Sequence, residues 1–169
     1  MPVQISEYVD IESRAKKLVT RVPTLIALLP ANFATARSKR DLYYDKHAQV
    51  LREQIAAAGY TETPFEKNGD VFKVPAQDDM LGHAKLGLFL GTPFFEGKPL
   101  APMAVWDLLN AAFADIVRRA PDFTKVTLEV VVQRPQARSY GLVKYSGSLL
   151  GLDSSDLQRA VQQVSAGIA

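Results

Sequence analysis

The sequence predicts an α+β fold: a small, mainly antiparallel sheet of about four strands covered by four or five helices. Three observations support this prediction. The chain has 169 residues, of which 47% are hydrophobic and 22% charged, a composition that suits one globular domain over residues 1–169. Residues 102–120 carry a broad apolar face at helical spacing. Residues 126–133 and 139–147 are rich in β-branched and aromatic residues and flank a short turn, which is typical of a hairpin.

A first helix is expected near the N-terminus, with Ser6 as its N-cap. Its acidic residues come first and its basic residues last, which complements the helix dipole. An apolar stripe recurs at alternating spacings of three and four residues, at Tyr8, Ile11, Ala15, Leu18 and Val22. Pro23 and Pro30 then bracket an apolar segment that we expect to form a separate turn or short helix.

A second helix is predicted over residues 36–58, with Gly59 as its stop. Its inward-facing residues are expected at Tyr44, Ala48, Leu51 and Ile55. Two short strands are predicted within residues 62–75, on either side of an Asn-Gly turn signal. Residues 78–95 fit either a glycine-rich buried helix or a strand, and we favour the helix.

The C-terminal half has clearer patterns. The apolar face of the helix at 102–120 is expected to bury Val105, Leu108, Leu109, Ala112, Phe113, Ile116 and Val117. The two β-rich runs that follow are predicted to pair as a hairpin. A final helix is expected after Leu152, because Ser155 and Gln158 have the spacing of a capping box.

Three spacings resemble catalytic or nucleotide-binding motifs, and each has a simpler explanation. Residues 91–98 resemble a phosphate-binding loop but have the wrong glycine spacing and no following hydroxyl. Tyr140 and Lys144 have the spacing of a dehydrogenase pair, yet in the expected strand they stand about 13 Å apart. Ser13 and Lys16 match a serine acylase pair that lacks its further elements.

Composition restricts the chemistry further. The chain has no cysteine, which excludes disulfides and thiolate catalysis, and only two histidines, which leaves a metal site or a nucleophile–histidine pair poorly supplied. We therefore predict no catalytic or metal-binding residue and no cofactor. A hydrolase or transferase built from dispersed carboxylates stays open. The polar N-terminus does not resemble a signal peptide, so we expect a cytoplasmic protein.

The stretch ARSKRDLYYDKH at residues 36–47 combines cations with aromatic side chains. Because the net charge is only +2, a nucleic-acid site would have to be a local patch. Phosphate contacts and base stacking need this combination of side chains. Asp41 and Asp45 reduce the local charge and favour an ordinary solvated face instead. The candidate nucleic-acid-binding residues are Lys39, Tyr43, Lys46, Arg134 and Arg138.

The run from Met80 to Phe95 is apolar, with Lys85 as its only internal charge. Burial in the core is the simpler interpretation. If part of the run is exposed, it forms an association surface, for which the candidate interface residues are Leu86, Phe89, Phe94 and Phe95.

From these observations we expect a non-catalytic cytoplasmic interaction or accessory module that acts through a protein–protein interface, with a protein partner or self-association. The alternatives are a nucleic-acid-binding module, a carboxylate-based hydrolase or transferase, and a membrane-interacting effector that inserts residues 80–117.

Overall fold

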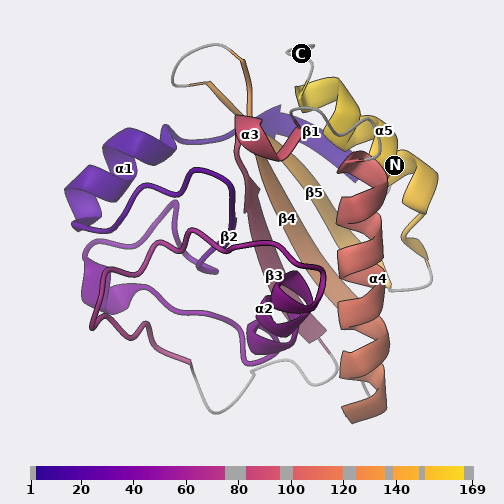
Figure 1. The fold of residues 1–169 in the computed structure, drawn as a ribbon, viewed down its shortest axis with the longest axis horizontal. Helices are drawn as coiled ribbons and strands as arrows, with labels where there is room; N and C mark the ends of the chain where they lie inside the picture. Colours follow the sequence, from indigo (N-terminus) through magenta and orange to yellow (C-terminus); the bar gives the residue numbers. More distant parts are fainter. Residues whose placement is uncertain are drawn as a thin grey trace.

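The computed structural model describes residues 3–74, 83–95, 101–119, 125–135, 139–148 and 151–165 (Figure 1). In chain order the elements are β1 (Val3–Glu7), α1 (Ile11–Leu18), β2 (Ile26–Leu28), η1 (Lys39–Asp41), α2 (Ala48–Ala57), β3 (His83–Leu90), α3 (Thr92–Phe95), α4 (Ala101–Arg119), β4 (Lys125–Gln133), β5 (Tyr140–Ser148) and α5 (Ser154–Ser165).

The strands form one five-stranded mixed sheet in the order β1-β5-β4-β3-β2. Strands β3 and β4 run parallel, and the other neighbours run antiparallel. The α+β class is confirmed, but the expected four-stranded, mainly antiparallel sheet is wrong. The helix α4 accounts for the difference, because it connects β3 to β4 as a crossover and lets the chain start β4 in the direction of β3.

Helices lie on both sides of this sheet. Helices α2, α4 and α5 pack beside one another, with α2 against β2 and β3 and α5 against β1, β4 and β5. Helix α1 lies on the opposite side, together with the long connecting segments before and after α2 (Figure 1). On that side Phe33, Phe65 and Phe89 pack ring against ring, with centroids 4.7 and 6.4 Å apart. The aromatic contacts therefore join the connecting segments to the sheet.

Helix α1 begins later than the sequence predicts. Asp10, rather than Ser6, is its N-cap, and its carboxylate accepts a hydrogen bond from the Ser13 backbone N–H at 3.2 Å. Ser6 belongs to β1. The predicted stripe is correct for Ile11, Ala15 and Leu18, which are buried, whereas Val22 is exposed.

The end of α1 is unusual. Val19 has φ 59° and ψ 45°, the left-handed conformation that a glycine or asparagine commonly adopts at this position. A β-branched side chain there costs on the order of 1–2 kcal/mol. The side chain of Val19 is 55% exposed, so burial offsets little of that cost.

Residues 24–29, expected as a turn or short helix, contain strand β2 instead. Ile26, Ala27 and Leu28 are all buried and pair with Leu90, Phe89 and Leu88 of β3. A strand that is buried on both faces has no alternation of polar and apolar residues, so its sequence does not distinguish it from a short buried helix.

The helix predicted over residues 36–58 is divided. Only the short η1 and α2 are helical, and residues between them bond elsewhere. The Tyr43 N–H donates to Asn32 Oδ1, and the Tyr43 carbonyl accepts from Ala31. The predicted inward residues Tyr44, Ala48, Leu51 and Ile55 are nevertheless buried, and α2 ends before Gly59, which has φ +86°.

The Asn-Gly turn at residues 67–70 is present, but its flanks do not pair as the predicted hairpin. Gly69 has φ +89°, and the Asp70 N–H donates to the Lys67 carbonyl. The residues before the turn pair with β2, because the Thr63 N–H donates to the Ile26 carbonyl at 2.8 Å. The residues after it pair with the segment before α2, through an isolated parallel bridge between Lys73 and Tyr43.

The helix favoured within residues 78–95 is wrong for residues 83–90, which form β3 between β2 and β4, and only Thr92–Phe95 of the described part are helical, as α3. Its glycines fit a crowded sheet. A Cβ on Gly87 would lie 2.8 Å from Leu29 Cβ, and one on Gly91 would lie 1.8 Å from the Thr24 carbonyl oxygen. Glycine is therefore needed where neighbouring backbone approaches β3.

The C-terminal predictions are largely confirmed. Helix α4 and the antiparallel pair β4 and β5 form where expected, although Val117 is 37% exposed rather than buried. Helix α5 is capped by Asp153, whose carboxylate accepts from the Ser155 N–H, so Ser155 lies inside the helix. Within the described ranges, no helix combines the length and apolar character needed to cross a bilayer.

Candidate functional site

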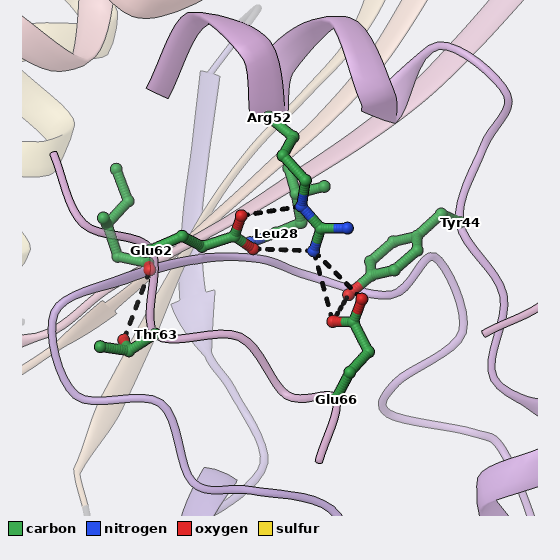
Figure 2. Close-up of polar contacts among 7 residues, drawn as sticks. Leu28, Tyr44, Arg52, Glu62, Thr63 and Glu66 are labelled. Atoms are coloured by element: carbon green, nitrogen blue, oxygen red, sulfur yellow. Dashed lines mark hydrogen bonds and ion pairs between the residues drawn. The ribbon is translucent and has the colours of Figure 1, made fainter. Parts of the chain in front are cut away.

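A polar network lies beside strand β2, centred on Arg52 of α2 (Figure 2). Arg52 holds Glu62 in a bidentate pair, from Nε at 2.7 Å and from Nη2 at 2.8 Å. Nη2 also lies 3.2 Å from an oxygen of Glu66. Burial alone lowers the pKa of Arg52, but the hydrogen bonds and charges of Glu62 and Glu66 outweigh it and raise the pKa. Two carboxylates thus hold one guanidinium in its charged form.

Tyr44 completes the network. Its hydroxyl donates to Glu66 at 2.6 Å, and the Arg52 guanidinium carbon lies 5.3 Å from its ring centroid. Burial is the largest cause that raises the pKa of Tyr44, and the Glu66 carboxylate raises it further. The tyrosine therefore stays protonated and serves as a donor.

The same network closes the outer edge of β2. Glu62 Oε2 accepts the Leu28 N–H at 3.3 Å, and Thr63 Oγ1 accepts the N–H groups of Thr24 and Leu25. Together with the bond from the Thr63 N–H to the Ile26 carbonyl, these contacts occupy backbone groups that an edge strand otherwise leaves unpaired.

Asp45 performs a related role on β3. Its carboxylate accepts the Lys85 N–H at 2.8 Å, the His47 N–H at 2.8 Å, and a contact from His47 Nδ1 at 2.9 Å. Burial acts to raise the pKa of Asp45, but the bonds from His47 and Lys85 outweigh it and lower the pKa. Asp45 is therefore a charged structural acceptor.

A pocket of about 320 Å³ opens beside the Arg52 network, and Tyr44, Asp45, Glu66, Asp70 and Phe72 contribute to its lining. Its charged groups are already engaged. Glu66 binds Arg52 and Tyr44, and Asp70 binds Lys39 and the Lys67 N–H. Across the ranges that the structure describes, no three histidine or acidic side chains are placed to hold a metal ion. These charged side chains bind neighbouring residues of the protein, so their contacts stabilise the fold around the pocket.

The opposite edge of the sheet differs. Strand β1 pairs with β5 in a register that sets Ile5 opposite Val143. The Tyr8 N–H bonds to the Tyr140 carbonyl, which fixes Gln4, Ser6 and Tyr8 as the residues bonded to β5. Because bonded and non-bonded positions alternate in an antiparallel pair, the N–H and C=O groups of Val3, Ile5 and Glu7 point away from β5. No described segment bonds to these outward groups.

The structure does not gather the candidate nucleic-acid-binding residues into one patch. Lys39 pairs with Asp70 at 3.1 Å, Tyr43 is partly buried, and Lys46 is exposed. Lys46 follows Asp45, whose carboxylate accepts the Lys85 N–H, and Lys85 pairs with Thr127 near the start of β4. Arg134 follows the end of β4, about 20 Å further along the strand. Arg138 lies outside the described residues.

Arg134 is buried, with 6% of its surface exposed. It forms an ion pair with Glu7 at 2.6 Å and donates to Ser139 Oγ and the Tyr140 carbonyl. Its guanidinium needs the space left by Gly141, where a Cβ would lie 3.1 Å from Arg134 Nη2. Arg134 therefore links Glu7, at the end of β1, to Tyr140, at the start of β5.

The candidate interface residues lie mostly in the core. Leu86, Phe89 and Phe94 are each at most 1% exposed, and the side chain of Phe95 lies outside the described residues. The two rejected motif pairs also have structural roles. Ser13 bonds to Asp10 and Lys16 to Glu12, while Tyr140 and Lys144 lie on strand β5.

The sequence analysis predicts neither the Arg52 network nor strand β1. Glu62 and Glu66 are four residues apart, but Pro64 lies between them, and no helical pattern linked them to Arg52. Because Ser6 is the predicted N-cap of the first helix, the residues of β1 are not predicted as a strand. Its alternating Val3, Gln4, Ile5 and Ser6 was the available signal.

Comparison of the chain with known protein families, with curated proteins and with solved structures finds no match in any of the three.

Proposed function

We propose that this protein is an interaction module that associates through the outer edge of β1, and that its partner is a second copy of the same chain. The observation that carries the proposal is the contrast between the two sheet edges. The β2 edge is closed by Glu62 and Thr63, whereas the outward backbone groups of β1 bond to no described segment. An unpaired strand edge is a template for a further strand.

The sequence of β1 suits pairing with itself. In an antiparallel pair centred on Ile5, Ile5 faces its counterpart, and Val3 faces Glu7 of the other copy. The outward N–H and C=O groups of Val3, Ile5 and Glu7 then bond to those of the other copy, in up to about six hydrogen bonds. The two Glu7 carboxylates lie at opposite ends of the pair, so no like charges meet.

The side chains also match across this pair. Val3 and Ile5 are half-buried and lie on the face covered by α5. The exposed part of Ile5 would become buried against Ile5 of the second copy, and that of Val3 against the aliphatic part of the opposite Glu7 side chain. Gln4 and Ser6 are exposed on the opposite face and would meet each other. Ile5 thus meets Ile5, Gln4 meets Ser6, Val3 meets Glu7, and the two sheets become one.

Light scattering after size exclusion, over a range of protein concentrations, tests the association. We expect a concentration-dependent shift from monomer to dimer that Ile5→Pro abolishes. This change removes an outward donor, whereas the bonds to β5 come from Gln4 and Ser6. Ser6→Ala is the matched control, and circular dichroism establishes that each variant is folded. A monomer at every concentration contradicts the proposal, as does a dimer that folded Ile5→Pro leaves intact.

Cysteine cross-linking tests the register independently of Ile5→Pro. The chain contains no cysteine, so Ile5→Cys introduces a single thiol. In the proposed pair the two Cα atoms at position 5 lie about 5.5 Å apart, within disulfide range. We expect a disulfide-linked dimer under mild oxidation. Ala114→Cys, on the exposed face of α4, should stay monomeric. If Ile5→Cys and Ala114→Cys cross-link to the same extent, that result contradicts association through the edge of β1.

A further inference from the structure

The end of α1, the turn at 67–70 and η1 lie together at one side of the molecule, far along the chain from one another (Figure 1). The Arg21 N–H donates to the Phe65 carbonyl at 2.8 Å, and Arg21 Nη2 donates to Asn68 Oδ1 at 3.1 Å. Lys39 of η1 lies 3.1 Å from Asp70 at the other end of the turn. These bonds make one continuous surface from the three segments.

This surface carries exposed valines. Val71 is 91% exposed, Val74 56%, Val19 55% and Val22 38%, and the only other large apolar side chain exposed to this degree in the described residues is Val117 of α4. Single exposed aliphatic residues are ordinary, but these four lie on two short segments, and Arg21 bonds the first segment to Phe65 and Asn68, just before the second. Val19 also keeps a β-branched side chain in a left-handed conformation, where glycine would be free of strain.

The same surface is basic. Apart from Lys39, which pairs with Asp70, its cations are Lys17, Arg21, Lys67 and Lys73. Asp70 is engaged by Lys39 and the Lys67 N–H, and Arg40 and Asp41 of η1 offset each other. Lys16 is balanced by Glu12. The nearby carboxylates Glu62 and Glu66 both pair with Arg52, and this group keeps one negative charge. The surface therefore has a net positive charge although the whole chain is close to neutral.

We propose that this valine-bearing basic surface, from α1, η1 and the 67–74 segment, docks on an anionic lipid membrane. Aliphatic side chains enter the boundary between head groups and acyl chains, and the lysines and arginines around them meet anionic head groups. A nucleic-acid surface would instead present aromatic rings for stacking, and Phe72, between the exposed valines, is buried. This proposal does not depend on the β1 edge.

Vesicle flotation tests the proposal. We expect the protein to float with vesicles made of equal parts phosphatidylcholine and phosphatidylserine, to stay behind with phosphatidylcholine alone, and to be released by salt. The variant Lys67→Glu/Lys73→Glu should bind the anionic vesicles at least about tenfold more weakly. Val71→Ser/Val74→Ser should also weaken binding severalfold, because the aliphatic contact is lost.

Two matched controls lie elsewhere on the protein. Val117→Ser removes an exposed valine from α4, and Lys125→Glu reverses an exposed charge on β4. Both should bind vesicles like the unchanged protein. No flotation with anionic vesicles at low salt overturns the proposal, as does binding that the two controls weaken as much as the surface variants. Retention on a mixed-sequence oligonucleotide without vesicle binding assigns the surface to nucleic acid and equally overturns it.

Discussion

Arg52 and Glu62 form a bidentate ion pair in which the Glu62 carboxylate also accepts the backbone N–H of Leu28. One side chain thus neutralises a half-buried guanidinium and closes the outer edge of β2. This double role makes the pair more than a surface salt bridge, because removal of Glu62 leaves both a cation and an edge amide without their acceptor.

Glu62→Ala should therefore destabilise the protein by about 1–3 kcal/mol in chemical denaturation. The matched control is Glu12→Ala, which breaks the exposed pair with Lys16 on α1 and should cost no more than about 0.5 kcal/mol. Equal effects from the two changes would show that the contact with Leu28 adds nothing.

Asp45 should make the folded state sensitive to acid. Its pKa is lowered in the fold, so its contribution is present above the unfolded pKa of about 3.9 and is lost as the pH falls through the folded pKa. Asp45→Asn should lower the free energy of unfolding at pH 7 by about 1–2 kcal/mol. The difference from the unchanged protein should narrow as the pH falls below about 4. A constant difference from pH 7 to acid would contradict the charged role of Asp45.

Val19→Gly should stabilise the protein, because glycine adopts the left-handed conformation without the Cβ conflict. The gain should be on the order of 1 kcal/mol, reduced by the greater freedom of glycine in the unfolded chain. Val22→Gly, at an exposed position where the backbone is not left-handed, should be neutral or destabilising. Thermal denaturation of both variants measures the difference. If the membrane proposal is correct, Val19→Gly should also bind anionic vesicles more weakly.

Gly91→Ala should be more damaging than Gly69→Ala. A Cβ at Gly91 meets the backbone of Thr24, which a rotamer change cannot relieve, so we expect a loss of about 3 kcal/mol or more. Gly69 has open space around it but a positive φ, so its substitution should cost only about 1 kcal/mol. Urea denaturation of the two variants tests the order, and a smaller loss at Gly91 would contradict the close approach of β2 to β3.

The sequence predicted the C-terminal half better than the N-terminal half, for a physical reason. Helix α4 and the β4–β5 pair rest on local patterns, a broad apolar face in one case and a short connection in the other. Strands β1 and β2 each pair with residues distant in the chain, and nothing local marks those partners. The segment at 61–74 also shows this limit, because its turn was predicted while its pairing with β2 and with Tyr43 was not.

Side-chain chemistry was less predictable than secondary structure. The candidate basic cluster rests on residue type, whereas the structure places Lys46 and Arg134 towards opposite ends of β4 and buries Arg134. The charges that do converge, around Arg21 and the 67–70 turn, come from segments that only the tertiary fold brings together. The sequence pattern places Asp45 on a solvated helix face, whereas in the structure Asp45 accepts the Lys85 N–H of β3.

The pairing of β1 with β5 has a consequence for how the chain is made. Strand β1 is synthesised well before its partner residues Gly141–Tyr145, because the two segments lie far apart along the chain. At typical rates of synthesis, β1 waits on the order of 10 s for its partner. During that interval both of its edges are open, so a nascent chain on a crowded polysome should depend on chaperones more than the finished protein does.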